Sequence, residues 1–162
     1  MADMTPPVTT RAATEEDEAF LFALFTAVRS PESAYSSLAP AQLDLLMNIQ
    51  YAGQKQTYGV QYPGGNHIVL LDGLPIGRIW FFRGGTEHQL VDISLLPEFR
   101  NRGIGGLLVT DAIAAARAAG VQLCCSVAVT NPASLRFHQR LGFQIVGQDE
   151  IYYDLVIDLG RN

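Results

Sequence analysis

Seven residues in the middle of the chain have the types and spacing to bind an anionic group. They read Arg100-Asn101-Arg102-Gly103-Ile104-Gly105-Gly106 and join an apolar, strand-like run, Leu90 to Leu96, to an alanine-rich helical pattern. A strand, a glycine-bearing turn and a helix place free backbone N–H groups at a helix N-terminus, where the macrodipole also favours negative charge. The glycines remove Cβ atoms that would hold a phosphate away from the backbone, and the two arginines add charge and donors. The segment therefore predicts a cradle for a pyrophosphate, and a plain strand-to-helix turn with two surface arginines is the alternative.

Two common phosphate-binding loops do not match this segment. No Lys-Ser or Lys-Thr pair follows the glycines, which argues against the loop of P-loop nucleotide hydrolases. The dinucleotide-binding fingerprint needs a different glycine spacing and an early position in the chain.

A second segment makes the first one specific. The pattern Arg100-x-x-Gly103-x-Gly105 resembles the acyl-CoA-binding signature of the GNAT superfamily of acetyltransferases. The residues from Asn131 to Phe143, Asn-Pro-Ala-Ser-Leu-Arg-Phe-His-Gln-Arg-Leu-Gly-Phe, resemble that family's second signature, an Asn that begins a helix ending in Leu-Gly-Phe. With the flanking strands the resemblance covers residues 89–157, and the first half of the chain is compatible with the family's variable N-terminal region.

The resemblance implies an α/β fold with a single mixed, mostly antiparallel sheet flanked by helices, and acetyl-CoA as cosubstrate. In that fold two strands, here those of Leu95 and Val127, splay apart, and backbone groups of the first pair with the pantetheine arm until Pro97 ends the edge. Asn131 would hydrogen-bond the arm and also cap its own helix. The positions implied to contact the cofactor are Leu95, Leu96, Pro97, Arg100, Asn101, Arg102, Gly103, Ile104, Gly105, Gly106, Leu107, Leu108, Asn131 and Ser134.

Acetyl transfer to an amine needs an acid for the leaving thiolate and a group that takes the amine proton. Many relatives use a Tyr as the acid, and the matching residue here is His138, which can donate a proton with a different pH profile or can simply pack. Some relatives carry a glutamate base where Ser126 stands. Asp92 is our candidate base, although a buried carboxylate satisfied by backbone donors is an equal alternative.

The acceptor site is expected between the N-terminal helices and the last hairpin. Tyr51, Gln54, Tyr58 and Tyr152 are candidates to line it, unless they serve packing alone. We expect an N-acetyltransferase whose acceptor is a small-molecule or peptide amine. The alternatives are an acyltransferase that uses a different acyl-CoA, and a non-catalytic sensor that binds acyl-CoA, which the absent Tyr and glutamate favour.

The elements that must position these residues follow from the apolar periodicity. We expect a strand at 8–11, a helix from Thr14 with its apolar stripe from Phe20 to Val28, and a second helix from Pro40. A hairpin with its turn at 72–73 is expected next, and the strand before the cradle follows it. After the helix that follows the cradle, we expect a strand at 121–129, a helix at 132–141 and strands at 143–146 and 152–157.

The bulk properties limit the function classes. With 162 residues, 48% of them hydrophobic, the chain predicts a single domain over 1–162 with a loose tail at 1–7. The net charge of −5 argues against nucleic-acid binding, and no long apolar run indicates a membrane span or export, so a cytoplasmic protein is expected. The three histidines, 67, 88 and 138, lack metal-ligand spacing, so no metal is expected, and a homodimer is left open. The adjacent Cys124 and Cys125 are expected to be core residues, with a functional thiol as the alternative.

Overall fold

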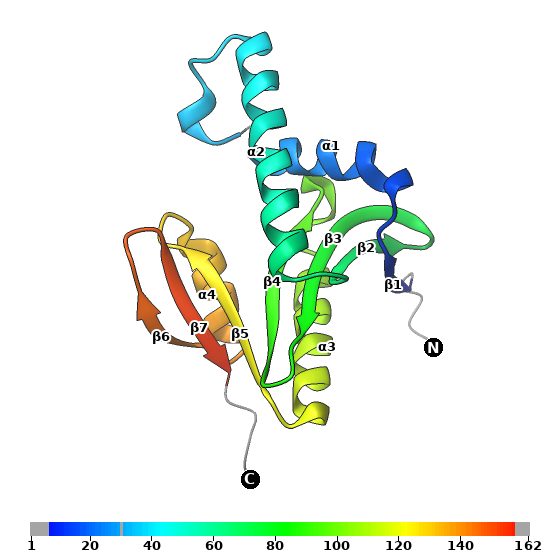
Figure 1. Ribbon diagram of the computed structural model, residues 1–162, viewed down its shortest axis with the longest axis vertical. Helices are drawn as coiled ribbons and strands as arrows, with labels where there is room; N and C mark the ends of the chain where they lie inside the picture. Colours follow the sequence, from blue (N-terminus) through cyan, green and yellow to red (C-terminus); the bar gives the residue numbers. More distant parts are fainter. Residues whose placement is uncertain (1–6, 30, 158–162) are drawn as a thin grey trace. The chain divides into compact units, whose positions relative to one another are not determined.

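The computed structural model describes residues 7–29 and 31–157, apart from the side chain of residue 33 (Figure 1). The loose tail that we expected at residues 1–7 lies outside the described residues except for Pro7. In the described part of the chain, no helix combines the length and the apolar character that crossing a bilayer requires.

The described strands form one seven-stranded sheet in the order β1-β2-β3-β4-β5-β7-β6. Their bounds are β1 (Val8–Ala12), β2 (Asn66–Leu71), β3 (Leu74–Arg83), β4 (Glu87–Leu95), β5 (Gln122–Ala128), β6 (Gln144–Gln148) and β7 (Tyr152–Ile157). β4 and β5 run parallel, whereas β1 with β2, β2 with β3, β5 with β7 and β6 with β7 run antiparallel. The predicted fold class, a mixed and mostly antiparallel sheet flanked by helices, is confirmed.

The helices also follow the predicted order. Their bounds are α1 (Glu18–Arg29), α2 (Pro40–Gln61), α3 (Ile104–Ala119) and α4 (Pro132–Arg140). β4, the strand expected before the cradle, begins at Glu87, and its first residues pair with β5, from Glu87↔Gln122 to Leu90↔Cys125.

Contacts between Cα atoms divide the chain into two compact units. One unit holds the residues up to Trp80 together with Asp92–Ile104, and the other holds Phe81–Val91 and the residues from Gly105 onward. The single domain over 1–162 stays a prediction.

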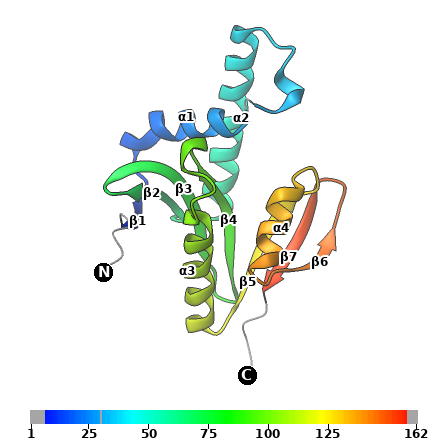
Figure 2. The same cartoon turned by 180° about the vertical axis from the view of Figure 1, so that it is seen from behind.

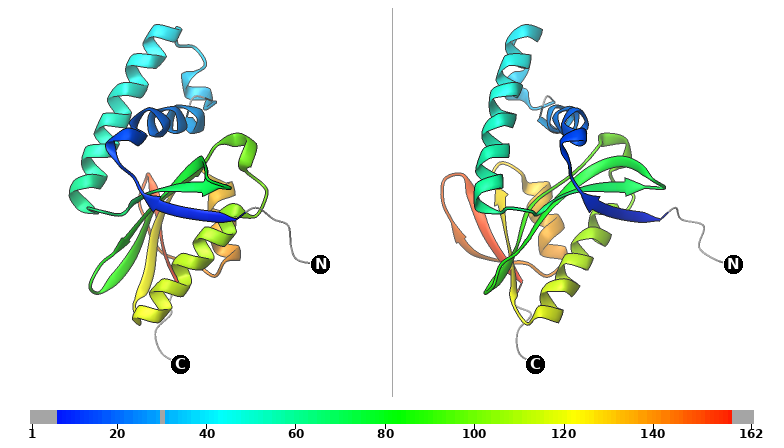
Figure 3. Two further views of the ribbon diagram at one scale, coloured as in Figure 1. Left: turned by 90° about the vertical axis from the view of Figure 1, so that its right-hand side faces the viewer. Right: turned by 45° about the vertical axis from the view of Figure 1, so that its right-hand side comes forward.

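The core of the first unit holds residues of α1, α2 and β2, together with Ile76 and Ile79 of β3. Leu21, Leu24 and Phe25 of α1 and Met47 of α2 are buried, as are Ile68 and Val69 of β2. In both views of Figure 3, α1 lies above β1 and β2. The apolar stripe predicted for the first helix thus faces this core.

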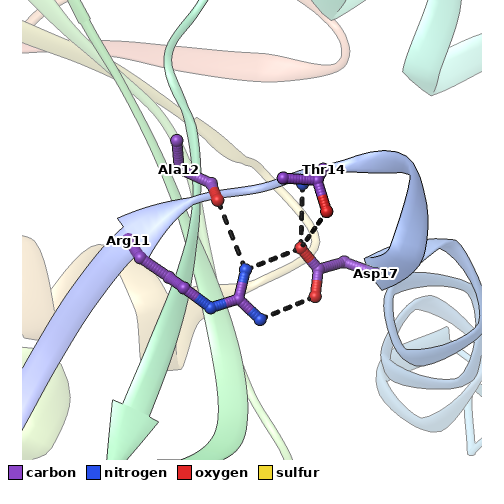
Figure 4. Close-up of polar contacts among 4 residues, drawn as sticks. All are labelled: Arg11, Ala12, Thr14 and Asp17. Atoms are coloured by element: carbon purple, nitrogen blue, oxygen red, sulfur yellow. Dashed lines mark hydrogen bonds and ion pairs between the residues drawn. The ribbon is translucent and has the colours of Figure 1, made fainter.

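An ion pair fixes the entry to α1 (Figure 4). Arg11 at the end of β1 donates from Nη1 and Nη2 to the two carboxylate oxygens of Asp17, both at 2.8 Å. The backbone N–H of Thr14 donates to Asp17 Oδ2 at 2.8 Å, as expected of a residue at a helix start. The Arg11 guanidinium, followed by this backbone bond, lowers the pKa of Asp17 to about 2.

The second unit is built on α3, α4 and the last three strands. Leu123, Cys125 and Val127 of β5 and Leu155 of β7 are buried, whereas Ser126 and Asp154 between them are exposed. Figure 2 shows α4 in front of β5 and β7, which places the helix against one face of this part of the sheet. The alternation of buried and exposed residues leaves the other face of β5 and β7 open to solvent.

Candidate functional site

The predicted cradle is a tight turn that leads directly into α3. Asn101 and Gly103 have positive φ angles of 61° and 81°, and α3 begins at Ile104. The first N–H groups of a helix have no partner within it, so those at the start of α3 are free for an anion. A Cβ on Gly106 would meet no atom within 4 Å, so the backbone there is open to close approach. The segment has the local geometry of a phosphate cradle.

The two arginines of the cradle are exposed but differ in their contacts. Arg100 donates from Nε to the carbonyl oxygen of Leu95 at 3.1 Å, so its side chain bends back onto the end of β4. The guanidinium carbon of Arg102 lies 5.3 Å from the centroid of the Phe99 ring, a cation–π contact. The N–H donors of Arg102 therefore remain available for an anion, whereas Arg100 already donates one hydrogen bond to Leu95.

The end of β4 is held by its own unit. Leu96 donates its N–H to the carbonyl of Ile76 on β3 at 2.8 Å, and its carbonyl accepts the N–H of Phe99 at 2.9 Å. A Cβ on Gly77 would collide with the carbonyl oxygen of Ser94, so β3 passes β4 here at a distance that only glycine permits. The carbonyls of Leu95 and Leu96 each keep a second lone pair, which an amide donor of a bound ligand can use.

Asp92 lies in an ion pair that the sequence analysis did not predict. Arg78 on β3 donates from Nη2 and Nε to Asp92 Oδ2 at 2.6 and 3.1 Å, and Ser94 donates its hydroxyl to the same oxygen at 3.1 Å. Arg78 is 6% exposed and carries the cation that satisfies this carboxylate. Asp92 Oδ2 thus already accepts three hydrogen bonds, and Asp92 would have to give some of them up to act as a base.

Two of the acceptor-lining candidates belong to this polar region of the first unit. Gln54 on α2 accepts a hydrogen bond from Arg78 Nη2 at 2.9 Å, and Tyr51 donates to Glu18 on α1 at 2.8 Å. Burial, and then the contact with Glu18, raises the pKa of Tyr51 above its ordinary value. The third candidate, Tyr58, is half-buried and meets the Trp80 ring edge-on with centroids 5.4 Å apart. All three therefore pack or hydrogen-bond within the unit.

In the second unit, α4 begins as predicted. Asn131 accepts the N–H of Ser134 through Oδ1 at 3.1 Å, with Pro132 in the first turn, so its expected capping role is confirmed. On the neighbouring helix, a Cβ on Gly105 would lie 3.5 Å from the Phe137 ring, which is ordinary contact.

His138 is buried in this unit, with 5% of its surface exposed. Its Nδ1 lies 2.8 Å from the carbonyl oxygen of Ser134, which accepts a hydrogen bond from the N–H of this nitrogen. Its ring meets those of Phe137 and Phe143 edge-on. Burial lowers the pKa of His138, although the contact with Ser134 opposes the shift. In the neutral ring Nε2 then carries no proton and is an acceptor. The acid role stays a prediction that depends on the protonated minority of this side chain.

Tyr152, the fourth acceptor-lining candidate, lies on the exposed face of β7 with 46% of its surface accessible. It pairs with Ala128 of β5, and two residues further along Asp154 pairs with Ser126. Because side chains two residues apart on a strand share a face, Tyr152 and Asp154 point to the same side.

The thiols and possible metal ligands of the described residues form no further reactive centre. Burial raises the pKa values of Cys124 and Cys125 to about 12, with a further contribution at Cys124 from Glu87, which accepts its S–H at 3.2 Å. Both sulfurs are therefore protonated thiols. Nowhere in the described ranges do three or more His, Cys, Asp or Glu side chains gather as metal ligands would.

Residues 32–143 match the family model described as the acetyltransferase (GNAT) family. The chain belongs to the GNAT family. The match covers more than half of the sequence and includes both segments that resemble the family's signatures. None of the curated proteins compared with this GNAT chain matches it.

Solved structures with the same GNAT fold come from several organisms. The PaiA N-acetyltransferase of Thermoplasma acidophilum in complex with coenzyme A is 16% identical, with a TM-score of 0.71 over 93% of this chain and 98% of that one. Naa50 of Arabidopsis thaliana, in complex with the bisubstrate analogue CoA-Ac-MVNAL, is 14% identical with a TM-score of 0.63 over 92% and 97%. A GNAT acetyltransferase of Elizabethkingia anophelis with acetyl-CoA bound is 16% identical with a TM-score of 0.59 over 93% and 97%. At these identities the likeness shows the fold.

The sequence analysis of this GNAT chain missed two residues that carry charge chemistry. Arg78 stands within the apolar run Ile76 to Trp80, and a charge in a buried strand needs a partner, so its presence was a usable signal. Asp154 gave no comparable signal, because its neighbours depend on which residues of β5 and β6 lie opposite it.

Proposed function

We propose that this GNAT protein is an acetyl-CoA-dependent N-acetyltransferase that transfers the acetyl group to a primary amine of a small molecule or peptide by direct attack. The observation that carries the proposal is the cradle at the start of α3, where Gly103 takes a positive φ and Gly106 leaves the backbone open. Family membership and the capping geometry of Asn131 support it. The relatives crystallised with coenzyme A or acetyl-CoA support the choice of cofactor.

Different groups of the chain would bind the cofactor and assist the proton transfers. The N–H groups at the start of α3, with Arg102, would hold the pyrophosphate, and the carbonyls of Leu95 and Leu96 would accept from the amides of the arm. Bound acetyl-CoA supplies an activated thioester, so the protein needs to add orientation, proton acceptance from the amine and support for the leaving sulfur. His138 is the proposed donor near that sulfur.

One experiment tests both cofactor and reaction. Thermal unfolding is measured with and without acetyl-CoA, and thiol release is then followed across a panel of small amines and peptides with free N-termini or lysine side chains. A ligand that binds the native state must raise its stability by mass action, so a rise in melting temperature is expected. Thiol release that depends on the amine, with the acetylated product identified by mass, is the expected second result. A protein without any thermal shift contradicts the proposal.

A non-catalytic acyl-CoA sensor is the second candidate. It is favoured by the neutral His138 at the position of the family's Tyr and by the engagement of Asp92 with Arg78. The sensor predicts a thermal shift without thiol release for any amine. Competition between acetyl-CoA and longer acyl-CoAs in the same assay identifies the preferred acyl chain.

A further inference from the structure

The described strands of the sheet carry three carboxylates, and they differ in their partners. Asp92 of β4 is ion-paired with Arg78, and Glu87 of β4 accepts a hydrogen bond from the thiol of Cys124. Asp154 of β7 is exposed, and within the described part of the chain its hydrogen bond comes from the neutral hydroxyl of Ser126 and no cation pairs with it. Among the described residues, Asp92 alone of the three is paired with a cation, so Glu87 and Asp154 are the two that can accept from a cationic or neutral amine, and their places on the strands distinguish them.

Asp154 is presented by the strands on both sides of it. On β5, Ser126 lies directly opposite and its Oγ donates to Asp154 Oδ1 at a long 3.4 Å. On β6, Gly147 lies opposite, next to the register shift between Ile145 and Gly147. A Cβ on Gly147 would lie 3.1 Å from Asp154 Oδ2, so the absence of a side chain there leaves room for that oxygen. One carboxylate oxygen thus accepts from Ser126, and the other lies beside Gly147, where there is no side chain to cover it.

The position along the strands also suits an acceptor site. Ser126 stands near the end of β5, which leads into α4 through Asn131, a residue proposed to contact the cofactor. Glu87, by contrast, lies at the start of β4, opposite the beginning of β5. Tyr152, a candidate lining residue, shares the exposed face with Asp154.

We propose that Asp154, oriented by Ser126 and given room by Gly147, is the carboxylate that binds the acceptor amine and takes its proton. This inference rests on the proposed function and names the acceptor class, an amine that can approach as a cation. The ammonium form is held by charge and loses one proton to solvent. The neutral nitrogen then attacks the acetyl carbonyl carbon, forming the C–N bond.

Asp154 accepts the proton that the nitrogen must lose after the attack. After attack the adduct nitrogen is positively charged and its remaining extra proton passes to a carboxylate oxygen of Asp154. The C–S bond breaks with its electron pair on sulfur, and the thiolate receives a proton from His138 or from solvent. Asp154 then returns its proton to solvent, and His138, where it was the donor, takes one back from solvent, leaving the amide and free coenzyme A thiol.

The test compares Asp154→Asn with Asp111→Asn, a matched loss of one charge at an exposed position of α3 in the same unit. On an amine that the wild-type protein acetylates, Asp154→Asn is expected to lower kcat/KM for the amine by about 10²- to 10⁴-fold, the usual worth of general-base assistance. The KM for acetyl-CoA and the thermal shift that it causes stay at the wild-type values. The Asp111→Asn variant behaves like wild type in every measurement.

Two further variants separate a catalytic role from a structural one. Ser126→Ala and Gly147→Ala leave Asp154 in place and disturb its orientation, so each is expected to give a smaller loss than Asp154→Asn. In Asp154→Ala, added acetate or formate restores part of the rate, which a merely structural residue would not allow. Turnover by Asp154→Asn equal to that of Asp111→Asn overturns the inference while the proposed function stands. A wild-type protein that binds acetyl-CoA but acetylates no amine overturns both.

Discussion

Arg78 and Asp92 form an ion pair within the first unit, with Arg78 Nη2 2.6 Å from Asp92 Oδ2. Arg78 is almost fully buried, and the same nitrogen also donates to Gln54 of α2. One buried cation therefore joins two strands and a helix. The cost of removing water from that cation is offset by these partners together, so each of them matters more than a surface contact would.

Replacement of Asp92 by Asn should destabilise the fold, because it leaves the Arg78 cation buried without a counter-charge. The expected loss lies toward the lower end of about 3–5 kcal/mol in the free energy of unfolding, since Asp92 itself is partly exposed. Urea unfolding measures it. The double variant Arg78→Met with Asp92→Leu should recover much of the loss, and an unchanged unfolding midpoint in Asp92→Asn would show that the pair carries little stability.

Gly106→Glu should abolish the stabilisation by acetyl-CoA while leaving the fold intact. A Cβ at this position would meet no atom within 4 Å, and an acidic residue in the first turn of a helix is favourable, so the variant should fold. Its carboxylate would occupy the place of the phosphates and repel them. Thermal shift with acetyl-CoA is the measurement, and Gly106→Ala, which lacks the charge, is the control. Equal shifts in wild type and Gly106→Glu would remove the cradle from the cofactor site.

His138→Phe should lower turnover with little change in affinity for acetyl-CoA. Burial lowers the pKa of His138, so the protonated ring, which is the acid, is lost at pH values below about 6.5, the ordinary pKa of histidine. The rate should therefore fall as the pH rises through that lower range. In His138→Tyr this limb should move toward the ordinary Tyr value of about 10. Rates measured from about pH 5 to 9 decide the matter. A His138→Phe profile identical to wild type would assign the ring to packing between Phe137 and Phe143.

Acid should destabilise the protein in two separate pH windows. His88 and His138 are buried and burial lowers their pKa values, so their stabilising contribution is complete above about pH 6.5 and is lost as the pH falls through the folded-state values. The Asp17 contribution is present above about pH 3.9 and is lost as the pH falls through about 2.

Free energies of unfolding measured from about pH 7 downward test both windows. Replacing His88 and His138 together by Phe should flatten the first, and Asp17→Asn should flatten the second. A stability that does not change between about pH 7 and 5 would contradict the account of the two histidines.

The parts of the fold that depend on local patterns could be predicted from the sequence. The strand from Tyr152 to Ile157 has the predicted bounds, and Asn131 caps α4 because an Asn followed by Pro and a helical pattern needs few tertiary contacts to do so. The glycine turn before α3 is likewise a property of adjacent residues.

The side-chain partners of the site depend on register and could not be predicted. The pairing of Arg78 with Asp92 requires a particular alignment of β3 and β4, and a shift by one residue would turn either side chain to the opposite face. Asp154 meets Ser126 through the register of β5 with β7, and it meets Gly147 through the register shift in β6. Burial of His138 and the direction of its ring also arise from tertiary packing, which changed the chemistry expected of an unperturbed histidine.

Gly77 determines the place of the β4 end at which the cofactor arm is proposed to pair. Since any side chain at residue 77 would strike the backbone of Ser94, the position of Leu95 and Leu96 depends on the absence of a side chain on the neighbouring strand. We therefore expect residue 95 to accept other apolar side chains, whereas we expect residue 77 to accept glycine alone. A saturation library at both positions, sorted for acyl-CoA binding, would return many residues at one and glycine at the other.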